Sequence, residues 1–433
     1  MTRAEHAEFG ASPSGLLRRR AVFGWGCFDF ANSPFTTLIV TFIYSTFFAQ
    51  VIAPENGGSL WARGVAISAV AVALLAPVLG AVADRGGRRK PLLFVFVAVC
   101  IACTSMLFFS QPGDVTRTLV LFVIANVAFE MGHVFYNAFL PDIATSKNMG
   151  RVSGFGWALG YLGGLLALVL CYVGLVAPEE PWFGIRKEEH QNIRFTTIVV
   201  AAWFAIFCLP TFFWVPDHRV ASRSDSSGSL LGDSFGRLLR TFGEIRKQRD
   251  IFYLLVARVF YNDGLMTIFV LGGIYAQDTF AFSREEIFQF GIALNVAAGV
   301  GAFAMGFLDD RFGGKRTVQL SVIVLLVASL IAVLGESKAS LWVAGGLVGL
   351  FAGPNQSASR SLMARLVPPD RKNEFFGFFA FSGKATNFLG PALFAWLSVQ
   401  FDSQRVGLSV VFVFFVIGFV LLSRVRDPKQ ESA

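Results

Sequence analysis

The sequence predicts an all-α integral membrane protein whose twelve transmembrane helices form two pseudo-symmetric halves of six. Three observations predict this fold. Of the 433 residues, 54% are hydrophobic and only 15% are charged, whereas about a quarter of the residues in a soluble domain are charged. Apolar stretches of about 20 residues, long enough to cross a hydrocarbon core of roughly 30 Å, recur along the chain. One short polar signature occurs twice, at residues 80–90 and 306–316, each time between two such stretches.

The apolar stretches define the order of elements along the chain. The predicted spans are 22–53, 61–83, 92–111, 117–140, 151–176, 195–216, 251–277, 287–308, 317–335, 340–364, 375–399 and 405–424. The longest polar interval is rich in serine and then basic, as expected for a linker between two halves. We therefore divide the chain into an N-tail (1–21), a first six-helix half (22–216), a linker (217–250), a second six-helix half (251–424) and a C-tail (425–433).

The formal net charge of +8 is explained by membrane topology. Most of the 37 Lys and Arg residues fall in the tails, the linker and the loops on one side of the predicted bundle. This positive-inside pattern predicts that the tails and the linker lie in the cytoplasm. The basic clusters are short, lie beside helix ends and lack interleaved aromatic residues, which argues against a nucleic-acid partner. Compact loops and the absence of a targeting extension favour a bacterial plasma (inner) membrane.

The repeated signature has two interpretations. Its charged residues are Asp84, Arg85 and Arg89 in the first copy and Asp310, Arg311 and Lys315 in the second. They either anchor helix ends at the lipid headgroups, or form a latch in which each Asp meets a cation or a helix terminus elsewhere. We predict the latch, because equivalent loops of both halves carry the signature.

Ionisable side chains inside the membrane identify a candidate central site. Each costs about 2.5–3.5 kcal/mol at the bilayer centre, so those that occur face a cavity or a partner. They fall in the first, fourth, seventh, tenth and eleventh spans, and helical spacing places several of them in polar stripes. The candidate substrate-binding or coupling residues are Asp29, Asn32, Glu130, His133, Asn137, Arg258, Asn262, Asp263, Gln356, Arg360, Lys384 and Asn387.

Apart from His133, the ionisable residues of this set are three acids and three bases, so the predicted cavity is formally neutral. A cavity with both signs suits a zwitterion, whose carboxylate meets a base and whose ammonium meets an acid. The alternative is that the six charges pair with one another as latches between the halves. Glu130 is the leading candidate for proton coupling, because a buried carboxylate holds a proton more readily than one in water. His133 either relays that proton or is only hydrogen-bonded.

The duplicated signature and the central linker resemble the major facilitator superfamily over the whole chain. A closer resemblance is to the autophagy-related vacuolar permease branch and its bacterial relatives. It is carried by the stretches Trp25–Ser33, Phe135–Pro141, Ala257–Gly264, Ser359–Ser361 and Phe376–Lys384. The resemblance implies two six-helix halves that rock about a central site, with helices one, four, seven and ten around the cavity. Family members with a known role are associated with amino-acid export from the vacuole.

The predicted function is secondary active transport of a small polar solute, an amino acid or similar zwitterion, by a monomer that the proton gradient or the solute's own gradient drives. The alternatives are a permease for an organic anion, sugar or drug-like compound, and a membrane sensor or lipid-handling protein that carries no solute. An enzyme is disfavoured, since the polar residues provide no nucleophile–base pair and no metal-ligand spacing. We expect no cofactor, and the sequence has no nucleotide-binding loop for ATP.

Overall fold

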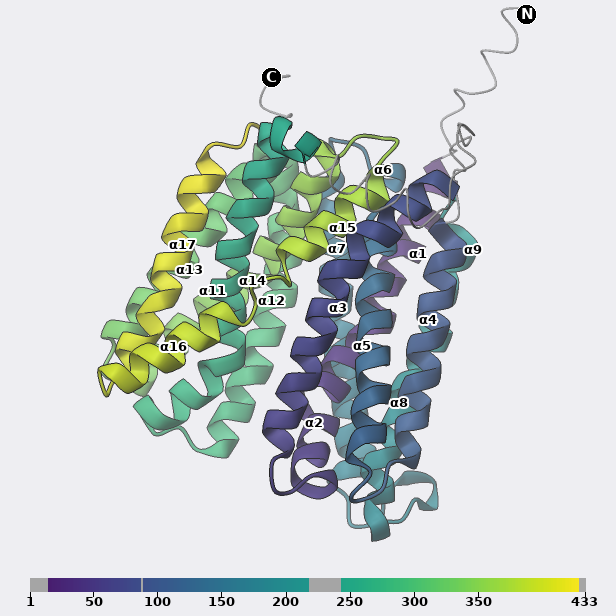
Figure 1. The fold of residues 1–433 in the computed structure, drawn as a ribbon, viewed down its shortest axis with the longest axis vertical. Coiled ribbons are helices and arrows are strands. Elements are labelled where there is room, and N and C mark those ends of the chain that lie inside the picture. The colour runs from purple at the N-terminus through teal and green to yellow at the C-terminus, as the bar shows by residue number, and fades with distance from the viewer. Residues whose placement is uncertain (1–14, 87–88, 218–242, 428–433) are drawn as a thin grey trace, which may run out of the picture.

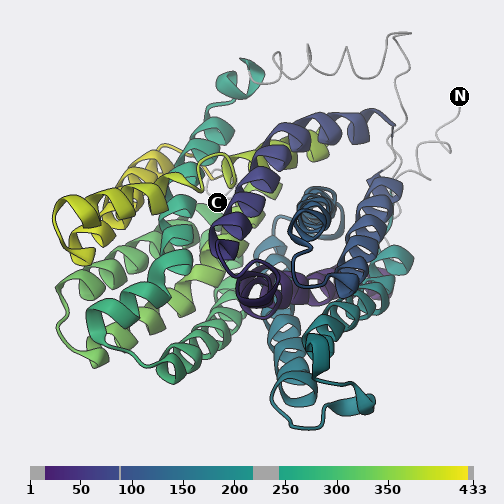
Figure 2. The same ribbon diagram turned by 60° about the horizontal axis from the view of Figure 1, so that its bottom comes forward.

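The computed structural model describes residues 15–86, 89–217 and 243–427, and within these ranges the chain forms helices and no strands. The helices are grouped into two bundles, one from each predicted half (Figures 1 and 2). The predicted tails and linker fall largely outside the described residues, at 1–14, 218–242 and 428–433.

The first bundle follows the predicted first half. Its helices are α1 (Gly15–Pro34), α2 (Tyr44–Phe47), α3 (Gly57–Gly86), α4 (Arg89–Met106), α5 (Val115–Asn137), α6 (Leu140–Ile143), α7 (Met149–Cys171), α8 (Gln191–Phe207) and α9 (Leu209–Trp214). Two π-helical segments, η2 (Phe35–Phe42) and η3 (Phe48–Ile52), continue α1 and α2, so that residues 16–52 form one apolar span. Pro34, which has no N–H to donate, lies where α1 passes into η2.

The second bundle follows the predicted second half. Its helices are α11 (Arg249–Phe280), α12 (Arg284–Phe312), α13 (Gly314–Leu334), α14 (Lys338–Leu366), α15 (Lys372–Ser382), α16 (Leu389–Gln400) and α17 (Gln404–Ser423). Helix α11 begins inside the interval that the sequence assigns to the linker.

Ten helical segments of the described chain are long and apolar enough to cross a membrane. The other two predicted spans are α14, which has 29 residues but a polar second half, and the pair α15 and α16. A count of twelve is therefore consistent with the structure. The prediction of one continuous helix over 375–399 is wrong, because residues 383–388 interrupt it. At Gly383 the guanidinium of Arg258 comes so close that a Cβ atom would overlap it.

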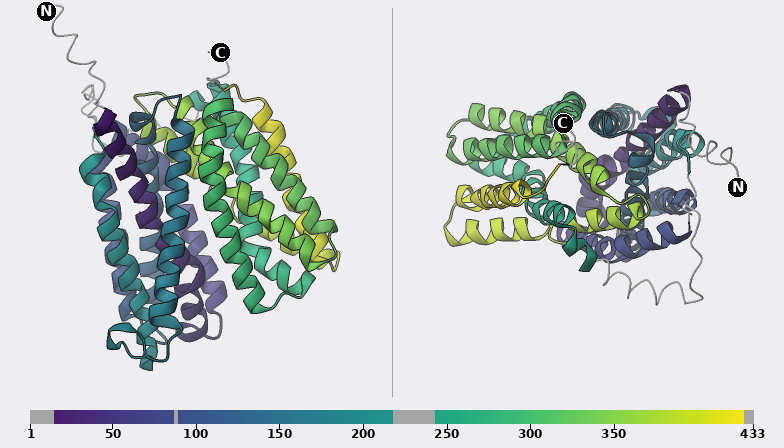
Figure 3. Two further views of the ribbon diagram at one scale, coloured as in Figure 1. Left: turned by 180° about the vertical axis from the view of Figure 1, so that it is seen from behind. Right: turned by 90° about the horizontal axis from the view of Figure 1, so that it is seen from above.

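The bundles meet at the end where α1 begins and α17 ends, which we call the terminal end, and they diverge toward the opposite, far end (Figures 1 and 3). Helix α7 packs against α12, and α3 packs against α15. The α7–α12 contact extends toward the far end, where the rings of Tyr172 and Phe288 are 5.9 Å apart. Past the interruption, α16 runs away from α3 (Figure 1).

Two equivalent glycine crossings hold the bundles together at the terminal end. A Cβ atom at Gly154 of α7 would overlap the carbonyl oxygen of Ala302 in α12, and one at Gly377 of α15 would overlap that of Ala76 in α3. Only glycine allows the backbones of two helices to approach so closely. The duplicated sequence therefore closes this end at two matching places.

We expect Gly154→Ala to open the terminal end, because the added methyl group forces α7 and α12 apart. Spin labels at Lys147 and Asp370, which are exposed at this end of the two bundles, should report a longer distance. Gly346→Ala is the matched control, since no atom lies within 4 Å of a Cβ placed there. An unchanged distance in Gly154→Ala would contradict the role of the crossing.

Candidate functional site

Asp29 of α1 and Arg360 of α14 form a buried ion pair that joins the two bundles. Arg360 Nη1 donates to Asp29 Oδ2 at 3.1 Å, and the two side chains are 4% and 9% exposed, respectively. The guanidinium also donates from Nε to the Ser153 hydroxyl at 2.9 Å and from Nη2 to the Ser153 carbonyl oxygen at 2.7 Å. Asn137 accepts a longer bond from Nη1, at 3.3 Å. Since the protein occupies all three guanidinium nitrogens, this geometry favours a latch over direct contact with a solute.

Aromatic rings surround the Arg360 guanidinium. Its carbon lies 4.6 Å from the ring centre of Trp25, 5.8 Å from that of Tyr136 and 5.7 Å from that of Trp157. Trp25 and Tyr136 are stacked with centroids 4.5 Å apart, and Trp25 Nε1 donates to the Tyr136 carbonyl oxygen. The electron-rich ring faces stabilise the cation and exclude water from the ion pair.

Glu130 of α5 and Lys384 form a second ion pair between the bundles. Lys384 lies in the interruption between α15 and α16, and its Nζ is 2.6 Å from Glu130 Oε1. The side chains are 18% and 29% exposed, more than those of Asp29 and Arg360. A solute or a proton therefore reaches this pair more readily than the first.

Arg258 of α11 lies near this second pair but has a different environment. Its Nη1 donates to the Phe379 carbonyl oxygen and its Nη2 to Gln356 Oε1, both at 3.4 Å, and its buried Nε has no partner. The guanidinium lies 3.9 Å from the centre of the Phe379 ring. A cation–π contact returns about 2 kcal/mol when desolvated, less than the several kcal/mol that burying a charge costs. Arg258 is therefore incompletely stabilised by its neighbours.

Three of the predicted polar residues form an amide cluster beside Arg258. Gln356 Nε2 donates to Asn262 Oδ1 at 2.9 Å, and Asn262 Nδ2 donates to Asn387 Oδ1 at 3.3 Å and to the Gly383 carbonyl oxygen at 3.1 Å. These contacts bring α11, α14 and the interruption after α15 together. They place hydrogen-bond donors and acceptors next to the Arg258 guanidinium.

Three other predicted residues lie apart from the ion pairs. Asp263 is 1% exposed, and its buried Oδ1 has no hydrogen-bond partner among the described residues. Asn32 is buried in α1. The His133 ring lies edge-on to neighbouring aromatic rings, and no hydrogen bond of the described residues joins it to Glu130. The structure thus gives His133 an aromatic environment.

The two signature copies place their Asp side chains at equivalent helix starts in the opposite bundle. Asp84 accepts from the backbone N–H of Asn373 at 3.1 Å, from Asn373 Nδ2 at 2.6 Å and from the backbone N–H of Glu374 at 2.8 Å, at the start of α15. Asp310 accepts from the backbone N–H groups of Gly150 and Arg151 at 2.8 and 3.2 Å, at the start of α7. A carboxylate at a helix N-terminus satisfies free N–H groups and the helix dipole.

The basic signature residues make contacts within their own bundles. Arg89 pairs with Asp142 at 2.5 Å, and Asp142 also pairs with Lys372 of the other bundle. Lys315 Nζ donates to the Ser423 carbonyl oxygen at 2.8 Å. Arg311 lies over the ring of its neighbour Phe312, while the side chain of Arg85 falls outside the described part of the structure.

Sequence reasoning missed several residues of this interface, among them Asn373, Asp142 and Lys372. It also missed Asp309, which is 1% exposed and pairs with Arg365 of its own bundle at 2.5 Å. Aligning the two signatures by position pairs Asp84 with Asp310 and leaves Asp309 without an acidic counterpart. Its burial, which the sequence does not show, is what marks Asp309 as an interior charge. One signal in the sequence could have identified Asn373 as a partner of Asp84. Asn373 lies just before a predicted span of the second half, as Gly150 does in the first.

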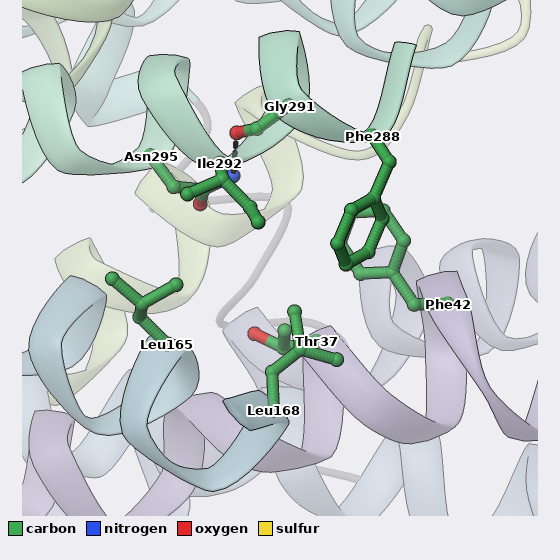
Figure 4. A pocket seen from close by; sticks show the side chains of 8 residues that line it. All are labelled: Thr37, Phe42, Leu165, Leu168, Phe288, Gly291, Ile292 and Asn295. Atoms are coloured by element: carbon green, nitrogen blue, oxygen red, sulfur yellow. Dashed lines mark hydrogen bonds between the residues drawn. The ribbon is translucent and has the colours of Figure 1, made fainter. Parts of the chain in front are cut away.

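A small enclosed space lies between η2, α7 and the first turns of α12 (Figure 4). Its volume is about 10 Å³, room for about one water molecule. The residues that line it are Thr37, Phe42, Leu165, Leu168, Phe288, Gly291, Ile292 and Asn295. The Asn295 amide donates back to the Gly291 carbonyl oxygen at 2.8 Å. This space is too small and too apolar to hold a polar solute, so the polar centre is the candidate site.

Two helical bundles that meet around a polar, membrane-embedded centre define a multi-pass transporter of the major facilitator type. A family model described as "Vacuole effluxer Atg22 like" matches residues 56–432. The chain belongs to this family.

Relatives and solved structures agree with this assignment. The chain is 28% identical over 413 residues to the uncharacterized MFS-type transporter YxiO of Bacillus subtilis (strain 168), covering 94% of this chain and 95% of that protein. It is 24% identical over 298 residues to autophagy-related protein 22 of Cryptococcus neoformans (strain B-3501A), covering 65% of this chain and 53% of that protein. The first of these relatives is described as a transporter.

Two solved transporters have the same fold. The human organic anion transporter MFSD10 (TETRAN) superposes with a TM-score of 0.76 at 16% identity, covering 95% of this chain and 100% of that chain. The fucose:proton symporter FucP of E. coli superposes with a TM-score of 0.73 at 13% identity, covering 95% and 99%. The likeness extends over both bundles and is one of fold.

We expect Asp84→Asn to weaken closure of the terminal end, because the amide loses the charge that the start of α15 stabilises. Hydrogen bonds to a charged group contribute about 1.5–3 kcal/mol, so the ratio of closed to open molecules should fall by roughly a factor of ten. The spin-label pair at Lys147 and Asp370 measures this ratio. Asp114→Asn, at the far end of the first bundle, should leave it unchanged. A normal ratio together with a large loss of solute affinity would contradict the latch.

Proposed function

We propose that the chain moves a small polar solute, an amino acid or a similar zwitterion, across the membrane by alternating access between its two bundles. The observation that carries this proposal is the Glu130–Lys384 pair, which joins the bundles at 2.6 Å, is partly exposed and has Arg258 nearby. The ammonium group of a solute can replace Lys384 at Glu130 while its carboxylate meets Arg258. A solute that carries both charges thus replaces the Glu130–Lys384 pair with two ion pairs of its own, one to Glu130 and one to Arg258.

The contacts between the bundles support the alternating-access part of the proposal. The terminal end is held by Asp84 at α15, by Asp310 at α7 and by the two glycine crossings. If the tails lie in the cytoplasm, as the charge pattern predicts, this arrangement is closed to the cytoplasm. Transport then requires the bundles to rock so that these contacts break and the far end closes. In this proposal the monomer lies in a bacterial plasma membrane.

Proton coupling follows from the same ion pair. When a movement of α15 takes Lys384 away and no solute ammonium replaces it, Glu130 is a buried carboxylate without its ion-pair partner. Burial then favours its protonated form. A proton bound at Glu130 would accompany the change of state.

Among the alternative solutes, a sugar fits this centre less well, because it has no charge with which to replace Lys384 or to meet Arg258. A sensor or a lipid-handling protein is disfavoured by membership of a transporter family. The family description names an effluxer, which fits export.

The proposal predicts that Glu130→Gln separates exchange from accumulation. In proteoliposomes preloaded with unlabelled amino acids, counterflow of a labelled substrate should persist with a higher KM, because the solute's ammonium loses a charged partner. Accumulation driven by a pH gradient should be lost. Glu286→Gln is the matched control, because Glu286 pairs with Lys338 at the far end and away from the centre. If accumulation driven by a pH gradient survives in Glu130→Gln, this residue is excluded as the proton carrier.

A further inference from the structure

The charges of the central site do not cancel. Asp29 pairs with Arg360 and Glu130 pairs with Lys384, at 3.1 and 2.6 Å. Arg258 has no carboxylate within ion-pair distance in the described ranges of the chain; its partners are one carbonyl oxygen and one amide oxygen. The centre therefore holds one positive charge more than the paired residues neutralise.

Asp263, the remaining intramembrane acid, does not supply the missing charge. It lies five positions after Arg258 in α11, about 140° around the helix, and so points to a different side. Among the described residues no ion pair joins its carboxylate to Arg258, whose hydrogen bonds go to Phe379 and Gln356, and the buried Oδ1 of Asp263 has no partner. Glu130 pairs with Lys384 at 2.6 Å, and no ion pair of the described residues joins it to Arg258.

The position of Arg258 suits an incoming carboxylate. Its two hydrogen bonds are at the long limit for such contacts, its Nε has no partner, and its guanidinium carbon lies over the Phe379 ring, 3.9 Å from the ring centre. A planar guanidinium held in one orientation presents parallel N–H groups that match the two oxygens of a carboxylate. Gln356 is the group that such a carboxylate would displace, and it can then bond to Asn262 alone.

We infer that the site selects a solute with a net charge of −1 that places a carboxylate on Arg258. This inference rests on the proposed transport function and narrows its substrate class. An acidic amino acid meets the requirement and uses the whole site, with its ammonium at Glu130 and its second carboxylate at Lys384. A simple monocarboxylate also meets it and leaves the Glu130–Lys384 pair intact. A neutral amino acid leaves one positive charge of the site uncompensated, that of Lys384 when its own carboxylate meets Arg258.

The test compares L-glutamate, L-glutamine and lactate in proteoliposome counterflow with the full chain. Glutamate and glutamine have nearly the same shape and differ by one negative charge. The wild-type protein should take up glutamate, or lactate, at least tenfold faster than glutamine. Uptake of lactate without glutamate would support the charge inference and replace the amino-acid substrate. Equal uptake of glutamate and glutamine, or faster uptake of glutamine, would overturn the inference while the transport function stands.

Variants assign the preference to Arg258. Arg258→Gln should lose the preference for the anion by at least tenfold and take up glutamine at least as well as glutamate. Arg258→Lys, which keeps the charge, should retain the preference with weaker binding. Arg405→Gln is the matched control, because Arg405 donates to the Val333 carbonyl oxygen at the far end and should behave as wild type. An intact anion preference in Arg258→Gln would overturn the assignment. Absence of counterflow for every amino acid and anion would overturn the transport function and, with it, this inference.

Discussion

A charge inside a membrane needs a partner, and in this protein the partner of each paired central charge comes from the other bundle. Asp29 of the first bundle meets Arg360 of the second, and Glu130 of the first meets Lys384 of the second. Because neither charge of a pair is satisfied alone, the position of one bundle relative to the other is tied to the state of the site. A solute or a proton that substitutes for one member of a pair therefore changes the free energy of moving one bundle relative to the other.

The two pairs divide this work according to their environments. Arg360 is surrounded by aromatic rings and bonded through all three nitrogens, so it serves to hold the bundles. Lys384 has Glu130 as its ion-pair partner and lies in a break between helices, where the chain can move without losing a continuous set of helical hydrogen bonds. The more exposed pair is therefore the one suited to exchange. Closure at the terminal end adds a third requirement to the proposed cycle, in which Asp84 and Asp310 leave the starts of α15 and α7 as the bundles rock.

The fold and the set of polar residues could be predicted from the sequence, because both depend on local composition and spacing. Apolar length identified the spans, and the repeated signature identified the two halves. The pairing could not be predicted: Asp29 and Arg360 are 331 positions apart, and nothing local chooses Arg360 over Arg258 or Lys384. The break after α15 was missed because an apolar run with glycine continues as a helix unless another side chain requires the space, and here Arg258 does. Assigning Asp310 to the start of α7 and Asp309 to Arg365 likewise requires the tertiary structure.

The most direct test of this account is a double-mutant cycle on the Asp29–Arg360 pair, measured as the free energy of unfolding in detergent or as Tm. The account predicts that Asp29→Asn and Arg360→Gln each destabilise the protein, by about 3–5 kcal/mol for an unpaired buried charge. The double variant should be less destabilised than the sum of the two, because it leaves no charge unpaired. Additive losses, or single variants as stable as the wild type, would show that the bundles do not depend on this pair.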